Sequence, residues 1–221
     1  MKAVLKYFVS NTYKPMLVRY LARPRTYSYK GIQVAVYPGV FHPGFFFSTK
    51  ILLNQIKRLD LQDRNFLELG AGTGLISIVA TKLGANVTAT DINPEAIQCL
   101  RKNRECNNVN FTVIRSDLFA SVPPQEFDVI AINPPYYKRN PANSAEYAWC
   151  CGENGEYFQN FFGEVGKFCR PDSIILMVLC DGCDIDMILH MAKIKGFRFE
   201  CLERRQNLLE KNFVFQFFKA S

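Results

Sequence analysis

From residue 48 onward, short apolar runs alternate with segments whose apolar residues recur every three to four positions. The apolar runs predict buried strands, expected at 66–69, 86–91, 111–115, 127–132, 173–179, 197–204 and 213–219. The periodic segments predict helices, expected at 48–59 with Ser48 as N-cap, and at 74–83, 94–106, 156–168 and 185–195. This alternation predicts an α/β fold with a doubly wound, Rossmann-like sheet of seven mostly parallel strands. Because no helix separates the last two strands, we expect the final strand to be an antiparallel edge.

The first 47 residues follow a different pattern and form a predicted N-terminal extension, ahead of a main domain at 48–221. A short helix is expected at 14–22. Residues 25–37 alternate in polarity and contain a turn at Lys30 and Gly31, which predicts a β-hairpin.

The extension also holds the excess positive charge. Residues 1–50 contain eight Lys or Arg and no Asp or Glu, whereas the remainder contains 19 basic and 20 acidic residues, which together give the net charge of +7. Six of the ten tyrosines are in the same segment. Basic residues interleaved with aromatic ones suit a polyanion such as RNA or a ribosomal surface. The alternative is a solvated face whose tyrosines pack on the main domain.

The overall composition narrows the class of protein. A hydrophobic fraction of 48% and a charged fraction of 21% are typical of a globular chain. We expect a cytoplasmic protein without membrane contact, because no apolar run approaches the roughly 20 residues of a membrane span and the first residues lack a signal-peptide pattern. The eight cysteines are expected to be thiols. Cys180 and Cys183 have no second pair or spaced histidine to complete a zinc site, so no metal is predicted. The sequence leaves the oligomeric state open.

Candidate chemistry gathers in the loops that follow the strands, where doubly wound sheets bind ligands. In LELGAGTGL, Glu68 ends a strand and three glycines allow a tight turn close to a ligand. Asp91 ends the next strand, where a carboxylate can accept hydrogen bonds from both hydroxyls of a ribose. Asp117 follows the third strand and can accept from an exocyclic adenine amine. Together these residues predict a nucleoside pocket, whereas the absence of G-x-x-x-x-G-K-[ST] argues against phosphoryl transfer.

The segments ELGAGTG, TDINPEA and INPPYY resemble the S-adenosylmethionine-dependent methyltransferases of the seven-stranded class. The resemblance implies S-adenosyl-L-methionine as the cofactor. It implies that Glu68 and Gly70 hold the methionine part, that Asp91 binds the ribose, and that Ile92 and Asp117 contact the adenine. The other cofactor contacts predicted from it are Thr49, Ala71, Gly72, Gly74, Ser116, Leu118 and Asn133.

The block INPPYY follows the fourth strand and predicts the catalytic residues Asn133, Pro134, Pro135 and Tyr136. An amine conjugated with a ring or a carbonyl is a poor nucleophile because its lone pair is delocalised. If the Asn133 side-chain oxygen and the Pro134 carbonyl each accept one N–H, the nitrogen becomes tetrahedral and its lone pair points at the sulfonium methyl. The two prolines stiffen the loop, and Tyr136 is expected to stack on the planar group.

The segment EYAWCCGENGEYFQNFF, at 146–162, bears on which planar amine is methylated. It is similar to the HemK-type release-factor glutamine methyltransferases and their shorter archaeal and eukaryotic relatives, which carry Gly-Gly-x-Asp/Asn-Gly. Gly152, Asn154 and Gly155 match that stretch, and Cys151 replaces its first glycine. The likeness spans about residues 36–219. The chain departs from the family in lacking the N-terminal helical bundle of the bacterial enzymes and the acidic residue that usually precedes Thr49.

Two enzyme hypotheses follow. In the favoured one, the protein methylates a glutamine side-chain amide of a translation factor or ribosomal protein. In the alternative, it methylates an exocyclic base amine, adenine N6 of ribosomal or transfer RNA, and the basic N-terminal segment binds phosphate. A third hypothesis, a cofactor-binding but inactive scaffold, is disfavoured by the intact block at 133–136.

Overall fold

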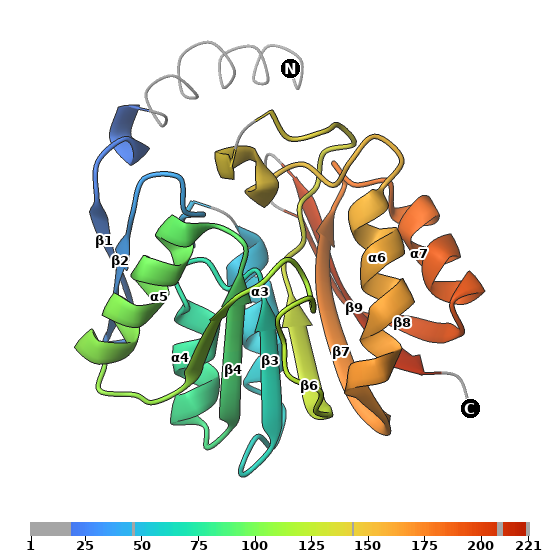
Figure 1. Ribbon diagram of the computed structural model, residues 1–221, viewed down its shortest axis with the longest axis horizontal. Coiled ribbons are helices and arrows are strands. Elements are labelled where there is room, and N and C mark those ends of the chain that lie inside the picture. Colours follow the sequence, from blue (N-terminus) through green and yellow to red (C-terminus); the bar gives the residue numbers. More distant parts are fainter. Residues whose placement is uncertain (1–18, 46, 143, 207–209, 220–221) are drawn as a thin grey trace.

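The computed structural model describes residues 19–45, 47–142, 144–206 and 210–219 (Figure 1). Its strands are β1 (Arg25–Tyr29), β2 (Ile32–Val36), β3 (Asn65–Leu69), β4 (Asn86–Asp91), β5 (Thr112–Arg115), β6 (Phe127–Ile132), β7 (Cys169–Cys180), β8 (Phe197–Gln206) and β9 (Lys211–Lys219). Its α-helices are α3 (Phe47–Ile56), α4 (Leu75–Lys82), α5 (Pro94–Cys106), α6 (Glu156–Glu164) and α7 (Ile185–Ile194). Two short 3₁₀ helices are η2 (Ser144–Ala148) and η3 (Val165–Phe168).

The main sheet has seven strands in the order β5-β4-β3-β6-β7-β9-β8. β3 pairs in parallel with β4 and β6, and parallel pairing continues to β5 on one side and to β7 on the other. The chain therefore runs outward from β3 twice, which confirms the predicted doubly wound, Rossmann-like sheet. The carboxyl ends of the parallel strands lie along one edge, and the strand order reverses between β3 and β6, where such sheets bind ligands.

The last strand is antiparallel, as predicted, but its expected place at the edge of the sheet is wrong. β9 lies between β7 and β8 and pairs antiparallel with both. Val214 and Phe217 of β9 are fully buried in the apolar clusters on opposite faces of the sheet. Most residues of β8 are exposed, and five of its ten carry a charge. A strand that is apolar on both faces suits the interior of a sheet, and an exposed, charged strand suits the edge.

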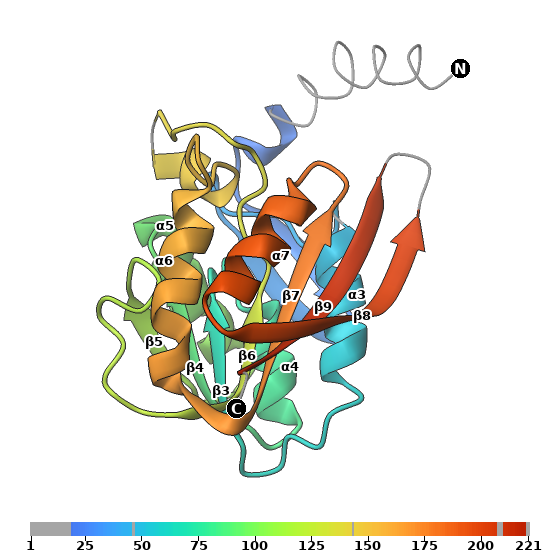
Figure 2. The same cartoon turned by 90° about the vertical axis from the view of Figure 1, so that its right-hand side faces the viewer.

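Helices cover both faces of the sheet (Figure 1 and Figure 2). On one face, α3, α4 and α5 pack with the hairpin in a cluster that includes Leu52, Ile78 and Leu100. On the other face, α6 and α7 pack in a second cluster that includes Phe158 and Ile188. These two cores fix the strands in place, so that the loops after the strands are held along one edge of the sheet.

The predicted hairpin is present at β1 and β2, which pair antiparallel. Lys30 and Gly31 between them have φ angles of 46° and 84°, as a two-residue turn with the twist of a hairpin requires. The Asn103 side-chain oxygen accepts a hydrogen bond from a backbone N–H of β2 at 2.7 Å. Tyr27 and Tyr29 pack against the apolar cluster around α3 and α4. These two tyrosines therefore pack on the main body of the protein.

The rest of the N-terminal extension is described only in part. Most of the helix expected at 14–22 lies outside the described residues, and the division of the chain at residue 47 stays a prediction. None of the helices in the described part of the chain combines the length and the apolar character of a membrane span.

Candidate active site

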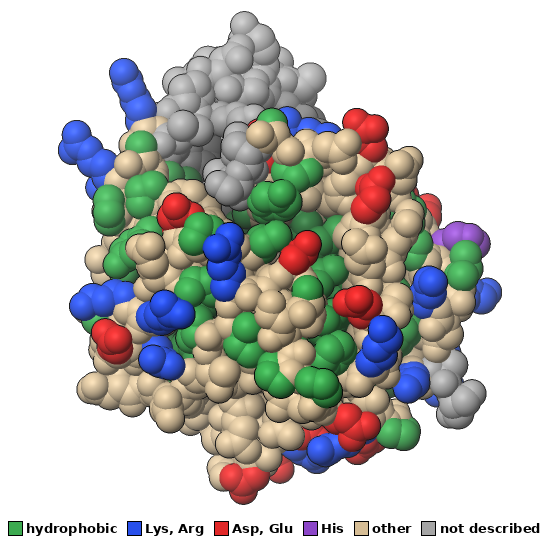
Figure 3. Space-filling model, viewed as in Figure 1, with side chains coloured by type: hydrophobic (Ala, Val, Ile, Leu, Met, Phe, Trp, Pro, Cys, Tyr) green, Lys and Arg blue, Asp and Glu red, His purple; other side chains and the backbone are tan. Residues whose placement is uncertain are grey.

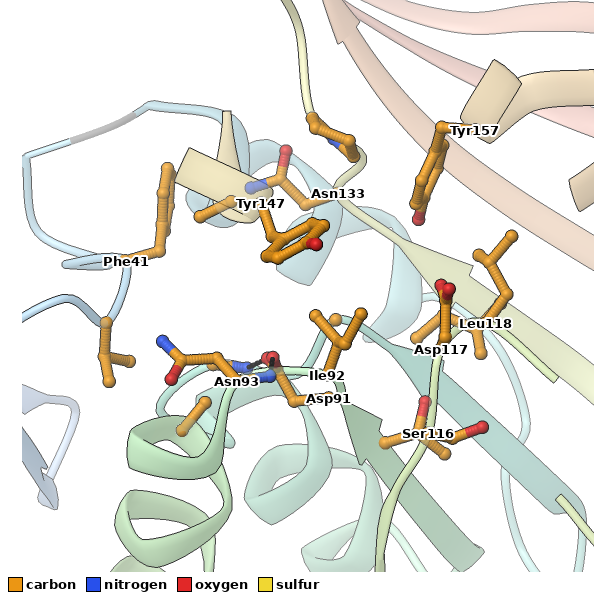
Figure 4. Close-up of a pocket in the computed structure, with 18 of the residues that line it drawn as sticks. Phe41, Asp91, Ile92, Asn93, Ser116, Asp117, Leu118, Asn133, Tyr147 and Tyr157 are labelled. Carbon is orange, nitrogen blue, oxygen red and sulfur yellow. Dashed lines mark hydrogen bonds between the residues drawn. The ribbon is translucent and has the colours of Figure 1, made fainter. Parts of the chain in front are cut away.

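A pocket opens beyond the carboxyl ends of β3, β4, β5 and β6 (Figure 4). Its walls come from the loops after these strands, from the segment before α3, from η2 and from the start of α6. The residues that line it are Gly39, Val40, Phe41, Leu69, Gly70, Gly72, Thr90, Asp91, Ile92, Asn93, Ala96, Ser116, Asp117, Leu118, Asn133, Pro135, Tyr147, Ala148 and Tyr157. The pocket therefore lies where the topology of the sheet predicts a ligand.

Glycines shape the loop between β3 and α4. Gly70, Gly72 and Gly74 have φ angles of 66°, 54° and 76°, a region that residues with a Cβ atom rarely enter. A Cβ atom at Gly70 would meet no other atom within 4 Å, so this side of the loop is open beside the pocket. A Cβ atom at Gly74 would lie 2.6 Å from the Leu100 side chain. Gly70 thus leaves room for a ligand, whereas Gly74 allows α4 to pack closely on α5.

Asp91 faces the pocket from the end of β4, and two backbone N–H groups hold its carboxylate. Gly72 N donates to Oδ2 at 2.9 Å, and Asn93 N donates to Oδ1 at 2.9 Å. Burial raises the pKa of the Asp91 carboxyl, and these hydrogen bonds act in the opposite direction. Since each carboxylate oxygen can accept more than one hydrogen bond, both oxygens can still bind ligand hydroxyls.

Glu68 does not line the pocket. Its side chain is buried, and Oε2 accepts hydrogen bonds from the Ser77 backbone N at 2.8 Å and from the Ser77 hydroxyl. Burial raises the pKa of Glu68 to about 8, and the hydrogen bonds from Ser77 oppose this rise. In this structure the carboxyl group joins β3 to the first turn of α4, so its contact with the methionine part of a cofactor stays a prediction.

The raised pKa of Glu68 predicts that the stability of the protein depends on pH. The pKa is about 8 in the folded protein and near 4.5 in the unfolded chain, so the folded state binds the extra proton between these values. The contribution of Glu68 to stability is full below pH 4.5 and declines as the pH rises to 8. We expect the decline to be on the order of 3 to 5 kcal/mol. Glu68→Gln keeps an acceptor for Ser77 and cannot ionise, so it should lose this dependence.

Urea unfolding of the wild type and of Glu68→Gln, at pH values between about 5 and 9, tests this expectation. The control is Glu105→Gln, which changes an exposed glutamate on α5 and should leave the slope of the wild type unchanged. The same decline in the wild type and in Glu68→Gln would contradict the assignment.

The loop after β5 forms a third wall. Ser116 is buried, its backbone N donates to Asp91 O at 3.0 Å, and its hydroxyl accepts from Ser121 N at 2.9 Å. Leu118 has a φ angle of 45°, which is uncommon for a residue with a Cβ atom and often marks a functional loop. Asp117, which lies between Ser116 and Leu118 in the sequence, is exposed and points toward Tyr157 (Figure 4).

Asn133 reaches the pocket from the loop after β6, and both ends of its amide are hydrogen-bonded within the protein. Nδ2 donates to Ser48 Oγ at 3.3 Å, and Oδ1 accepts from the Tyr136 hydroxyl. The expected role of Ser48 as N-cap is wrong, because α3 begins one residue earlier, at Phe47. Its hydroxyl instead binds Asn133. The amide is therefore fixed with its oxygen and nitrogen in defined positions.

Tyr136 is placed differently from a ring that stacks on a ligand. Its side chain is buried, and it does not line the pocket. Burial raises the pKa of the Tyr136 phenol well above its ordinary value, so the hydroxyl stays protonated and donates to Asn133. This placement supports a role in orienting the Asn133 amide, whereas the stacking of Tyr136 on an acceptor stays a prediction.

The segment before α6 holds the loop after β6. The backbone N atoms of Tyr136 and Tyr137 both donate to Trp149 O, at 2.9 and 2.6 Å, and Cys151 N donates to Tyr137 O at 2.9 Å. Gly155 has a φ angle of 74° and is the N-cap of α6. The stretch that resembles Gly-Gly-x-Asn-Gly therefore lies against the loop that carries Asn133.

The pocket brings together part of the predicted site. The predicted residues that line it are Gly70, Gly72, Asp91, Ile92, Ser116, Asp117, Leu118, Asn133 and Pro135. Those that do not line it are Thr49, Glu68, Ala71, Gly74, Pro134 and Tyr136. Three aromatic residues that line the pocket, Phe41, Tyr147 and Tyr157, were not predicted from the sequence. The only signal for two of these rings was the aromatic composition of 146–162.

The two cysteines of the CxxC lie at the turn between β7 and α7. Cys180 and Cys183 are free thiols, and their Sγ atoms are 3.9 Å apart. Within the described ranges, no group of three or more His, Cys, Asp or Glu side chains is arranged to hold a metal ion.

The comparison with protein families shows to which class of enzyme this chain belongs. The model of the methyltransferase small domain matches residues 31–149, which is more than half of the chain. The chain belongs to this methyltransferase family. This confirms the resemblance to methyltransferases that the glycine loop and the INPPYY block indicate.

Two curated relatives of this methyltransferase match along most of their length. The putative protein N5-glutamine methyltransferase MJ0928 of Methanocaldococcus jannaschii is 32% identical over 182 residues, which cover 79% of this chain and 89% of the relative. The human methyltransferase HEMK2 is 32% identical over 165 residues, which cover 70% of this chain and 77% of the relative. The predicted likeness to HemK-type enzymes is therefore confirmed.

Solved structures match the fold of the methyltransferase. The Mtq2–Trm112 complex of E. cuniculi, described as responsible for the methylation of the eRF1 translation termination factor, gives a TM-score of 0.65 at 22% identity, covering 82% of this chain and 99% of the matched one. The T. thermophilus 16S rRNA N2 G1207 methyltransferase, in complex with AdoMet and guanosine, gives a TM-score of 0.66 at 21% identity. The match covers 90% of this chain and 50% of the matched one. Enzymes with protein and with RNA acceptors thus share this fold, so the fold alone does not select the acceptor.

Proposed function

We propose that this methyltransferase uses S-adenosyl-L-methionine to methylate the side-chain amide of a glutamine in a translation factor or ribosomal protein. The observation that carries the choice of glutamine is the match to the putative N5-glutamine methyltransferase over 89% of that relative. The position of Asn133 in the same pocket as Asp91 supports the chemistry.

The residues that line the pocket support the binding of S-adenosylmethionine. Both Asp91 oxygens can accept from the ribose hydroxyls, and Ile92 offers an apolar side chain to the adenine. The open side of Gly70 leaves room for the methionine part. When bound, the cofactor supplies a methyl group on a positively charged sulfur.

The residues after β6 prepare the acceptor nitrogen. The Tyr136 hydroxyl and Ser48 hold the Asn133 amide, and its oxygen can accept one more hydrogen bond. The substrate nitrogen that is to be methylated can donate one N–H to this oxygen and the other to the Pro134 carbonyl. Its lone pair then points away from both oxygens. The new N–C bond would form as the bond between the methyl carbon and sulfur breaks, and the two oxygens would stabilise the positive charge that develops on the nitrogen. The methylated nitrogen is then strongly acidic and releases its proton to water, so no strong base is needed.

A protein acceptor is favoured over RNA. A curated relative that matches 79% of this chain at 32% identity is named for glutamine. On the face shown in Figure 3, the basic side chains of the described residues are interspersed with acidic ones, whereas RNA binding favours a continuous basic surface. Apolar side chains gather between these charges in the middle of the same face (Figure 3).

The acceptor class is tested by incubating the purified protein and methyl-labelled S-adenosylmethionine with extract from a strain that lacks the protein. The extract supplies any partner subunit together with the acceptor. We expect label that resists nuclease, is released by protease, and maps by mass spectrometry to a glutamine side chain. The Asn133→Ala variant serves as the matched control for background labelling.

Label that protease leaves intact and nuclease removes would overturn the proposal in favour of RNA. Label on protein at a residue other than glutamine would also overturn it.

A further inference from the structure

The pocket contains a ring that is better placed than Tyr136 to contact the acceptor. Tyr147 comes from η2 and lines the pocket together with Asn133. Its ring points into the pocket, between Phe41 and Ile92 and on the same side as Asn133 (Figure 4). Tyr136, in contrast, is buried and uses its hydroxyl to hold Asn133.

Exposure separates Tyr147 from the other rings of the pocket. The Tyr147 side chain is 46% exposed, compared with 8% for Tyr136. Tyr157 is half-buried, packs edge-on against Phe158 at 5.4 Å between ring centroids, and lies near Asp117 on the side predicted for adenine. Phe41 packs against Trp149 at 5.4 Å. Among these rings, Tyr147 therefore combines a place in the pocket with the largest surface that an incoming side chain can reach.

Hydrogen bonds couple the position of Tyr147 to that of Asn133. Trp149, two residues after Tyr147, accepts from the backbone N atoms of Tyr136 and Tyr137. Its own N donates to Glu146 O at 2.9 Å, and the Glu146 carboxylate pairs with Arg139 at 3.2 Å. Residues on both sides of Tyr147 are thus fastened to the loop after β6. A change in the position of that loop would move the ring and the amide together.

We infer that Tyr147 is the positioning residue for the acceptor, and that the planar carboxamide of the substrate glutamine stacks on its ring while its nitrogen binds Asn133. This inference rests on the proposed function. A flat ring restricts the plane of the carboxamide, so that the N–H groups point along the pocket wall toward the two acceptor oxygens. The hydroxyl of Tyr147 has no part in this contact.

Three variants test the role of the ring. Tyr147→Ala removes it, Tyr147→Leu keeps apolar volume without a flat face, and Tyr147→Phe removes only the hydroxyl. The assay uses a recombinant translation termination factor as acceptor, and calorimetry gives the Kd of S-adenosylmethionine. We expect the Ala and Leu variants to raise the KM for the acceptor by roughly 3- to 10-fold, the scale of one aromatic contact. The Phe variant should match the wild type, and the cofactor Kd should stay unchanged in all three.

Tyr137→Ala is the matched control. This tyrosine belongs to the same loop, is 51% exposed and does not line the pocket, and its hydrogen bonds to Trp149 and Cys151 are made by backbone atoms that alanine keeps. It should leave the acceptor KM unchanged. Three results would each overturn the inference. The acceptor KM could be the same for Tyr147→Ala as for the wild type, it could be the same for the Leu and Phe variants, or the cofactor Kd could rise as much as the acceptor KM. These outcomes are read against a wild type that methylates this acceptor, whereas failure of the wild type to label glutamine in the extract assay overturns the proposed function instead.

Discussion

Replacing Asn133 with alanine is expected to lower the rate of methyl transfer by roughly 10²- to 10³-fold, the loss seen when one preorganised hydrogen-bonding group is removed from a transition state. Ser48 and Tyr136 fix the orientation of the Asn133 amide before any substrate binds. Alanine removes the oxygen that accepts from the reacting nitrogen. Of the predicted cofactor contacts, the substitution removes only the one at Asn133 and leaves those at Asp91 and Gly70, so the Kd of S-adenosylmethionine should change by less than about threefold.

Single-turnover kinetics on the glutamine acceptor, combined with calorimetry for the cofactor, measures these two effects separately. Ser48→Ala is the graded control, because it removes the partner of the Asn133 nitrogen and keeps the oxygen. We expect a smaller loss for it, about tenfold or less, which corresponds to one neutral hydrogen bond. A rate for Asn133→Ala equal to that of the wild type would remove Asn133 from the mechanism.

Replacing Asp91 with alanine is expected to raise the Kd of S-adenosylmethionine by roughly 10²-fold or more. The carboxylate offers charge-assisted hydrogen bonds to two ribose hydroxyls, and each contributes about 1.5 to 3 kcal/mol. Alanine also leaves the N–H groups of Gly72 and Asn93 without the acceptor that fixes the glycine loop. Both effects weaken cofactor binding, and calorimetry measures their sum.

The comparison variant for Asp91 is Asp117→Ala, in the same pocket. Asp117 is exposed, so water screens its contact with adenine and its removal should raise the Kd by about tenfold or less. Circular dichroism of both variants checks that the fold is retained. Equal effects of the two substitutions would contradict the ranking that burial and the backbone hydrogen bonds of Asp91 imply.

The sequence predicts those parts of the molecule that depend on periodicity. Apolar runs locate β3, β4 and β6 to within one residue, and the loops after them must lie together because the strands are parallel and adjacent. The helix expected from residue 94 begins at Pro94 as α5, and the structure adds Asn93 as its N-cap. The placement of Asp91 and Asn133 in one pocket follows from this regular framework.

Features that depend on three-dimensional packing were not predictable in the same way. The direction of Tyr136 is set by a hydrogen bond to Asn133 and by Trp149 of a distant segment, and neither leaves a periodic signal. Tyr147 lies in a short 3₁₀ helix, whose single turn has no amphipathic pattern to read. The order of β8 and β9 in the sheet depends on which of them is covered on both faces. This cannot be read from the sequence without knowing where α3, α6 and α7 pack.

The position of β9 also governs how the molecule can be completed during synthesis. β7 and β8, the two neighbours of β9 in the sheet, are both synthesised before it. They do not pair with each other, because β9 lies between them. Until β9 emerges, β7 presents an open row of backbone N–H and C=O groups, and such edges invite pairing with other chains. The half-sheet that carries the nucleoside loops is complete earlier. The strands whose loops line the pocket therefore all precede, in the chain, the strand that covers the open edge of β7.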